Sequence, residues 1–161
     1  MEVEYRLRDK WGYVIANYSY YSSAGKENVD DYKIPGNETM LLGFPSSKAN
    51  LSAWIKVGKY FGVSPSFSYI GERYGYVRVD DSTGISIAEP FKPIVLANLN
   101  VNVTNLVKGL TIGLGCYDIL NSKYSFIQPY NGYHAPLPGP SRELLVKVTY
   151  EVKSQKKKRE R

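Results

Sequence analysis

Residues 142–152 read RELLVKVTYEV, and this segment decides the fold class. Its apolar side chains recur at every second position: Leu144, Val146, Val148, Tyr150 and Val152. Polar side chains fill the positions between them, at Glu143, Lys147, Thr149 and Glu151, with Leu145 as the one exception. Successive side chains of a β-strand point to opposite faces, so the alternation predicts a strand with one apolar and one polar face.

The same alternation recurs in six further segments, at residues 3–8, 14–20, 48–57, 61–69, 93–104 and 110–116. In 93–104, valine, alanine and leucine alternate with Asn98, Asn100, Asn102 and Thr104. Trp54 is an exception, because it falls on the polar face of its segment. The chain is therefore expected to be all-β, an antiparallel up-and-down meander of about seven strands.

The connections between these segments alternate in length. Three are short, at residues 9–11, 58–60 and 105–108. Three are long, polar and rich in Gly, Pro and Tyr, at residues 23–44, 75–92 and 122–141. Outer-membrane barrels have short periplasmic turns, longer extracellular loops and strands with alternating faces, whereas a soluble sandwich has no reason to gather its long loops at one end. The sequence has no run of about 18 apolar residues that would form a transmembrane helix. An open segment of a transmembrane β-barrel is the favoured architecture.

Tyrosine is unusually frequent, with 15 residues against 2 Met and 1 Cys. Six tyrosines lie near strand ends next to long connections: Tyr18, Tyr20, Tyr21, Tyr69, Tyr74 and Tyr76. Three lie nearer the short turns: Tyr5, Tyr60 and Tyr150. Tyr and Trp are enriched where a membrane protein meets the lipid headgroups, so the set predicts an aromatic girdle at each end of the strands.

The two ends of the chain indicate a piece of a longer protein. The first residues, MEVEYR, contain no apolar segment of the kind that a secretory signal needs, so the chain is expected to be a fragment. Residues 153–161 form a basic tail that is expected to be disordered and solvated, and no nucleic-acid partner is expected. The predicted domain is therefore residues 1–152.

The residues that carry chemistry are few. One histidine, His134, and one cysteine, Cys116, cannot supply a catalytic triad or a usual transition-metal site, so neither an enzyme nor a metal or other cofactor is expected. Acidic residues gather in two long connections, at Glu27, Asp30, Asp31 and Glu38 and at Asp80 and Asp81. They lack the spacing of a calcium loop and are interpreted as solvated charge.

Four short motifs, in order along the chain, resemble the C-terminal third of TonB-dependent receptors. Pro45, Lys48, Asn50 and Leu51 resemble a Pro-x-x-Lys-x-Asn strand entry, and Tyr69, Gly71 and Arg73 match a Tyr-x-Gly-x-Arg strand end. Asp118, Ile119, Leu120, Asn121, Lys123 and Tyr124 resemble an Asn-Leu-Phe-Asp-x-x-Tyr motif with the Asn and Asp exchanged. Pro138, Gly139, Pro140, Ser141 and Arg142 resemble the Pro-Gly-Arg entry to the last strand.

The resemblance implies a location and an activity. Barrels of this family have roughly 22 strands around a plug, so the chain would be an open C-terminal part of such a barrel in the bacterial outer membrane. The family imports a ligand such as a ferric siderophore, vitamin B12 or a glycan, and it engages TonB through the plug region, which this chain lacks. Tyr130, Tyr133 and His134, in the last long connection, would then contact the ligand.

Two other architectures fit part of the pattern. A free-standing soluble β-sandwich or lipocalin-like binder would turn its apolar faces inward and need no lipid bilayer. A small complete membrane barrel is the third possibility, but bacterial barrels have an even strand count of at least about eight, which seven strands do not satisfy.

Overall fold

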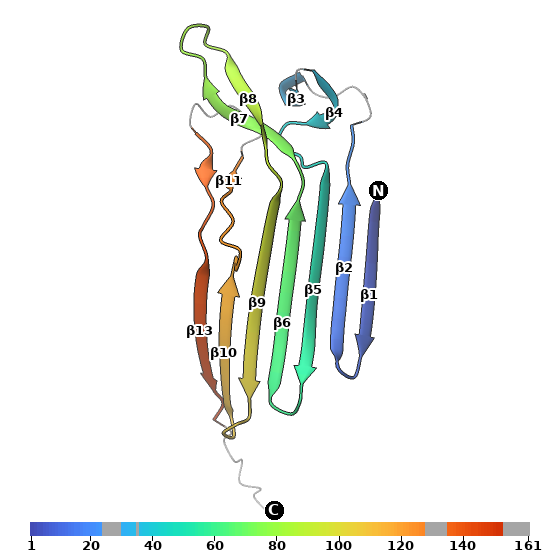
Figure 1. The fold of residues 1–161 in the computed structure, drawn as a ribbon, viewed down its shortest axis with the longest axis vertical. Helices are drawn as coiled ribbons and strands as arrows, with labels where there is room; N and C mark the ends of the chain where they lie inside the picture. The colour runs from blue at the N-terminus through green and yellow to red at the C-terminus, as the bar shows by residue number, and fades with distance from the viewer. Residues whose placement is uncertain (24–29, 35, 128–134, 153–161) are drawn as a thin grey trace, which may run out of the picture.

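The computed structural model describes residues 1–23, 30–34, 36–127 and 135–152. Seven strands form one antiparallel sheet in the order β1-β2-β5-β6-β9-β10-β13, which is an up-and-down meander (Figure 1). Their bounds are Glu2–Asp9, Gly12–Tyr20, Ser47–Val57, Phe61–Ile70, Ile94–Thr104, Leu110–Tyr117 and Glu143–Tyr150. All seven predicted strands are confirmed, with ends that differ from the predicted ones by at most a few residues.

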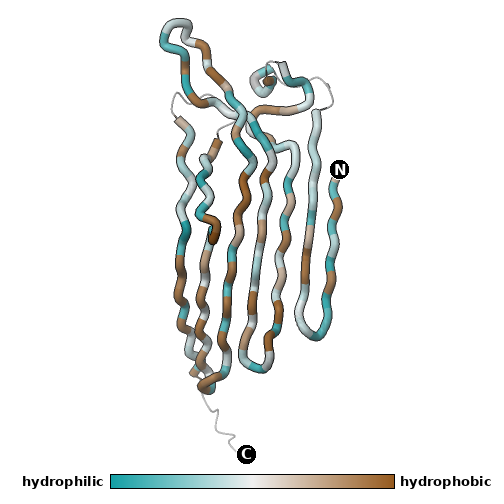
Figure 2. The backbone as a smooth tube through the Cα atoms, viewed as in Figure 1, coloured by the Kyte–Doolittle hydropathy of each residue, from teal (hydrophilic) through white to brown (hydrophobic). Residues whose placement is uncertain are grey.

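The register of the ladders joins the alternating patterns into two continuous faces. One row across five strands is apolar throughout: Val57, Phe61, Val103, Ile112 and Val148. The row beside it is polar or small: Lys56, Gly62, Asn102, Gly113 and Lys147. The alternation of hydrophobic and hydrophilic positions is visible along each strand in Figure 2. The sheet thus has one apolar face and one polar face.

The apolar face is uncovered in the described part of the chain. Leu144 is 79% exposed and Val146 67% exposed, although both are paired in the β10–β13 ladder. Buried hydrophobic side chains there are limited to Ile34, Leu42 and Ile94. A sandwich or lipocalin-like binder would cover these side chains with a second layer or close the barrel around them. Neither feature is present among the described residues, so the soluble alternative does not describe this fold.

The two ends of the sheet differ as the connection lengths predict. Figure 1 shows the turns that follow β1, β5 and β9 at one end and the three long connections at the other. No helix within the described ranges is long and apolar enough to cross a membrane.

The long connections contain structure that the sequence pattern did not predict. Each holds a small two-stranded sheet: β3 with β4 (Lys33–Ile34, Asn37–Leu41), β7 with β8 (Arg73–Val79, Ser86–Phe91) and β11 with β12 (Ser125–Phe126, Leu137–Pro138). A single 3₁₀ turn, η1 (Asp30–Tyr32), precedes β3, where no helix was expected. Tyr74 and Tyr76 therefore lie in the β7–β8 hairpin, beyond the end of β6, and not in a girdle at the strand ends. A register shift between Tyr76 and Arg78, together with Pro90 in β8, interrupts the alternation that would have revealed this hairpin.

The tip of the β7–β8 hairpin is organised by one carboxylate. Asp80 Oδ1 accepts hydrogen bonds from the backbone N–H of Ser82 (2.8 Å) and of Thr83 (3.1 Å) and from the Ser82 hydroxyl. The Ser82 hydroxyl and backbone bonds, aided by Thr83, lower the pKa of Asp80 to about 2. Asp80 is therefore a turn-capping residue as well as a solvated charge. Within the described residues, no group of three or more possible metal ligands is present.

Acid is expected to loosen this hairpin tip. Because folding depresses the pKa of Asp80 from 3.8 to about 2, its contribution is complete above pH 3.8 and is lost as the pH falls through about 2. Amide exchange at Ser82 and Thr83, measured by NMR, should remain slow to about pH 4 and accelerate below it, after correction for the intrinsic pH dependence of exchange. Asp80→Ala should abolish the effect and Asp81→Ala should preserve it. An identical profile in Asp80→Ala would contradict the assignment.

Candidate functional site: the polar face and its rim

The polar face carries a ladder of neutral side chains across neighbouring strands. Asn50 Nδ2 on β5 donates to Asn17 Oδ1 on β2 at 3.0 Å, and Ser68 Oγ on β6 donates to Asn50 Oδ1 at 2.8 Å. One strand pair further, Asn98 Nδ2 on β9 donates to Ser66 Oγ at 3.1 Å. These amide and hydroxyl groups keep further hydrogen-bonding capacity for water, which suits a wall that lines an aqueous interior.

Glycines allow the asparagine side chains to lie along the sheet. A Cβ at Gly115 of β10 would lie 2.6 Å from Asn100 Oδ1, and one at Gly113 would lie 2.8 Å from Asn102 Oδ1. Each amide thus occupies the space above a glycine on the neighbouring strand. The Trp54 ring uses Gly62 in the same way, with Nε1 3.0 Å from the position of a Cβ. These side chains therefore lie flat against the polar face, at Gly62 of β6 and at Gly113 and Gly115 of β10.

The segment after β10 is fixed by its own hydrogen bonds. Asp118 and Asn121 adopt positive φ values of 46° and 52°, which Asp and Asn tolerate better than most residues. Asp118 N–H donates to Asn98 Oδ1 at 2.9 Å, and Asp118 Oδ2 accepts from Ser122 N–H at 2.8 Å. Arg142 donates from its backbone to Asn121 Oδ1 at 3.1 Å and from Nη2 to Ile119 O at 2.6 Å. The motif around Asp118 therefore ends β10 and positions the start of β13.

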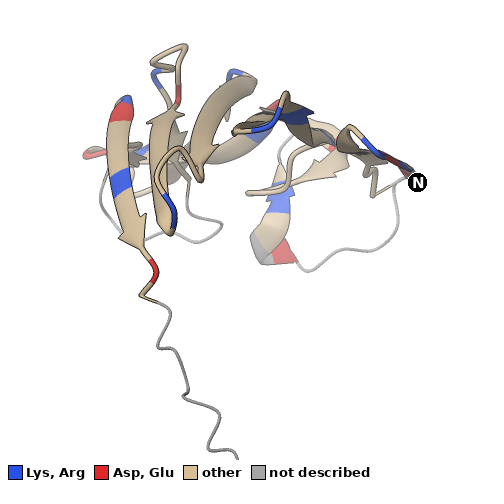
Figure 3. Ribbon diagram, turned by 90° about the horizontal axis from the view of Figure 1, so that it is seen from below, with Lys and Arg blue, Asp and Glu red and all other residues tan. Residues whose placement is uncertain are grey.

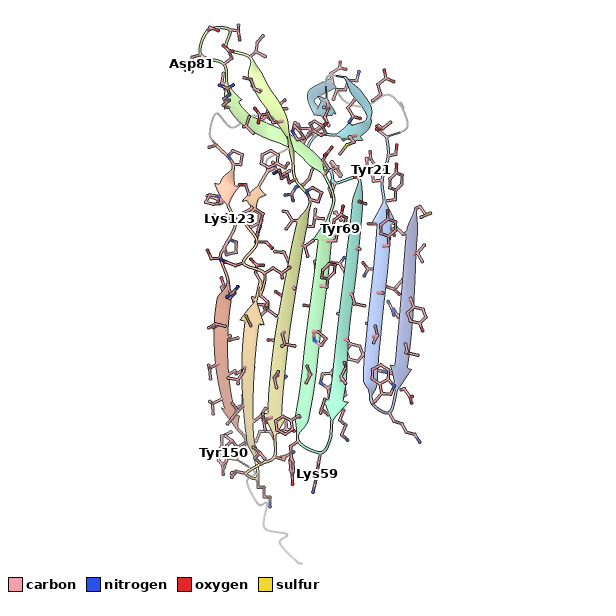
Figure 4. The ribbon with its side chains drawn as sticks, viewed as in Figure 1. Tyr21, Lys59, Tyr69, Asp81, Lys123 and Tyr150 are labelled. Atoms are coloured by element: carbon pink, nitrogen blue, oxygen red, sulfur yellow. The ribbon has the colours of Figure 1, made fainter. Side chains whose placement is uncertain are left out.

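Aromatic side chains mark both ends of the spanning strands. Tyr21 and Phe44 pack with their ring centroids 5.8 Å apart, beside the end of β2. Figure 4 shows Tyr21 and Tyr69 at the end with the long connections and Tyr150 with Lys59 at the opposite end. Tyr150 is 64% exposed. Tyr21, Tyr69 and Tyr150 agree with the predicted girdles, whereas Tyr74 and Tyr76 do not, and neither does Tyr5, which lies in the middle of β1.

Charged residues are absent from β2, β6, β9 and β10, whereas the edge strands β1 and β13 contain several (Figure 3). On β1, Glu4 and Arg6 share the polar face and form an ion pair. Figure 3 also looks along the strands and shows that the sheet is curved. A curved sheet with a polar and an apolar face matches the wall of a barrel that separates water from lipid.

The predicted ligand-contacting residues Tyr130, Tyr133 and His134 lie outside the described residues, as does the basic tail 153–161. The described segment just before them, at Ile127, lies against the β7–β8 hairpin, since a Cβ at Gly75 would be 2.1 Å from Ile127 Cγ2. The last long connection therefore begins on the face of that hairpin.

Among the described residues, two buried side-chain atoms have no hydrogen-bond partner, Arg73 Nε and Asp118 Oδ1. Sequence reasoning noted both residues only as members of motifs. Burial of Arg73 depends on how the long connections pack against one another. The alternation of side chains along a strand carries no information about that packing.

Comparison with known proteins gives a clear result for the fold. No family model and no curated protein matches the sequence. Among solved structures, the ferric-catecholate import receptor Fiu of E. coli K12 matches with a TM-score of 0.73 at 17% identity, covering 92% of this chain and 20% of that one. The chain has the fold of a TonB-dependent receptor barrel segment.

Other receptors give the same match to this barrel segment. The outer-membrane ferripyoverdine receptor of Pseudomonas aeruginosa matches with a TM-score of 0.70 at 13% identity, over 92% of this chain and 19% of the receptor. The FrpB iron transporter of Neisseria meningitidis matches with a TM-score of 0.62 at 14% identity, over 92% and 23%. The segment thus spans about a fifth of the length of these proteins, which are receptors and transporters rather than enzymes.

Proposed function

We propose that residues 1–152 form the C-terminal part of the barrel of an outer-membrane TonB-dependent transporter, which binds a ligand at its outer mouth and imports it. The observation that carries this proposal is the continuous apolar face opposite a continuous polar face across all seven strands. Lipid requires the first face and an aqueous interior the second.

The open edges of the sheet support a longer parent barrel. In an antiparallel meander of seven strands, β1 and β13 run in the same direction, and the outer edge of each is unpaired in the described sheet. Closing the barrel with antiparallel pairs at both edges requires an odd number of additional strands and gives an even total, as in bacterial barrels. A second copy of the chain cannot supply them, because every β13–β1 junction between copies would be parallel.

The matched proteins support a ligand class for this proposal. They are receptors or transporters for ferripyoverdine, ferric catecholate and iron, so a ferric siderophore is the first candidate, with vitamin B12 and glycans as alternatives. In this proposal Tyr130, Tyr133 and His134 contact the ligand from the last extracellular connection, and TonB acts through a plug supplied by another part of the protein. The tail 153–161 remains solvated.

Uptake by the complete protein tests the proposal. Iron-starved cells that carry the intact gene should accumulate a radiolabelled ferric siderophore, and deletion of residues 1–152 should abolish uptake together with outer-membrane localisation. Replacing Tyr130, Tyr133 and His134 together with Ala should reduce uptake and leave localisation intact. A full-length protein found in the soluble fraction without detergent would refute the membrane assignment.

A further inference from the structure

Arg73 lies where the long connections pack together. It is the first residue of β7 and pairs with Phe91 at the end of β8. Nearby, Gly43 N–H donates to Tyr74 O at 2.7 Å, and Ser46 N–H donates to Glu72 O at 3.2 Å, so the first long connection is tied to the base of this hairpin. The hairpin extends beyond the ends of β6 and β9, at the mouth of the proposed barrel (Figure 1).

The Arg73 side chain is buried without a partner. The residue is 8% exposed, Nε has no hydrogen-bond partner, and Arg73 forms no ion pair in the described part of the chain. Burial lowers the pKa of Arg73, because desolvation disfavours the charged form. A guanidinium nevertheless stays protonated in proteins, so Arg73 carries a positive charge that no ion pair balances among the described residues.

The surroundings of Arg73 do not supply a counter-charge. Gly75 lies two residues along β7, on the same face, and contacts Ile127 and the Phe91 ring at the position of its missing Cβ. Glu72, just before β7, is exposed, and the exposed Glu89 pairs with Gly75 in register, yet neither is ion-paired with Arg73. The guanidinium therefore lies beside an apolar wall with its Nε–H unpaired.

We propose that Arg73 binds a carboxylate group of the imported ligand. The planar guanidinium fork matches a carboxylate in a bidentate arrangement, and the low dielectric of the apolar wall strengthens that interaction. The proposal rests on the proposed function for the source of the carboxylate. Binding of a carboxylate by Arg73 can be measured whether or not the complete protein is a transporter.

The Nε–H resonance of Arg73 reports the interaction directly. In the complete receptor in detergent micelles, titration with acetate should shift this resonance saturably, and sodium chloride at equal ionic strength should not. Arg73→Gln should abolish saturable acetate binding, and Arg73→Lys should weaken it by about tenfold or more, since the ammonium lacks the fork. Arg78→Gln removes an exposed arginine of the same strand and should leave binding unchanged.

The other results separate the possible sources of the oxyanion. A resonance that is already protected from exchange, does not respond to acetate and moves in Glu72→Gln or Glu89→Gln would overturn the proposal in favour of an internal partner. Saturation by inorganic phosphate but not by acetate would overturn the carboxylate class.

In the complete receptor, Arg73→Lys should also raise the ligand concentration for half-maximal uptake without changing outer-membrane localisation. An unchanged concentration would show that the imported ligand does not supply the carboxylate. Failure of the proposed function would appear separately, as loss of localisation or uptake in the unaltered protein.

Discussion

Replacing Leu99 with Arg is expected to destabilise the membrane-inserted barrel by about 2–4 kcal/mol, the cost of a cationic side chain at the bilayer midplane. Leu99 is central in β9 and lies on the apolar face between Pro65 and Cys116 in register. An arginine at this position would place its charge in the hydrocarbon. Urea unfolding of the assembled barrel in phospholipid vesicles measures the loss.

Ser64→Arg is the matched control. Ser64 on β6 pairs with Asn100, one residue along β9 from Leu99, but its side chain lies on the polar face. The same charge at nearly the same depth should therefore cost less than about 1 kcal/mol, because lumen-facing substitutions do not enter lipid. Equal losses for the two variants, or a larger loss for Ser64→Arg, would show that the faces are assigned wrongly.

Replacing Gly12 with Ala is expected to disrupt the first hairpin and its pairing with β5. Gly12 has φ of +148°, and a Cβ would lie 1.9 Å from the backbone oxygen of Trp54. Backbone cannot move aside as a flexible side chain can, so β2 would shift away from Ile55, its ladder partner. The combined strain and lost pairing should destabilise the barrel by about 3 kcal/mol, measured by the same urea unfolding.

Gly58→Asn provides the comparison for Gly12→Ala at the same end of the sheet. Gly58 also has positive φ, at 63°, but nothing lies within 4 Å of a Cβ at this position. Asn tolerates this left-handed conformation, so the loss should stay below about 1 kcal/mol. If Gly12→Ala proves as mild as Gly58→Asn, the close approach of β2 to β5 at this turn is not a feature of the folded protein.

The seven long strands could be predicted because each strand has one apolar and one polar face. Residues 93–104 were predicted as a strand, and β9 spans Ile94–Thr104, since every second side chain is apolar. The two exceptions to alternation have a structural cause. Leu145 on β13 lies opposite Gly115, and Trp54 on β5 lies against Gly62, so each large side chain lies beside a glycine of a neighbouring strand. That pairing depends on register, which one segment does not contain.

The three long connections at one end of the sheet could not be predicted to the same extent. The β7–β8 hairpin is a two-stranded ribbon with a register shift, so its side chains do not keep one period. The motif containing Tyr69, Gly71 and Arg73 was recognised, but its physical roles came only from the structure. Gly71 brings its backbone N–H 2.8 Å from Ser47 O, and Arg73 is buried among elements that lie far apart in the sequence. Tyr130, Tyr133 and His134 stay predictions.

Accessibility of spin labels along β9 tests the central claim most directly. Single cysteines at residues 95–103, introduced into Cys116→Ala protein in vesicles, would each carry a nitroxide. The account predicts a period of two: labels at Val95, Ala97, Leu99, Val101 and Val103 collide with oxygen dissolved in lipid, and those between them collide with a water-soluble nickel chelate. Equal exposure of all positions to the chelate, or the opposite phase, would contradict a sheet whose apolar face contacts the bilayer.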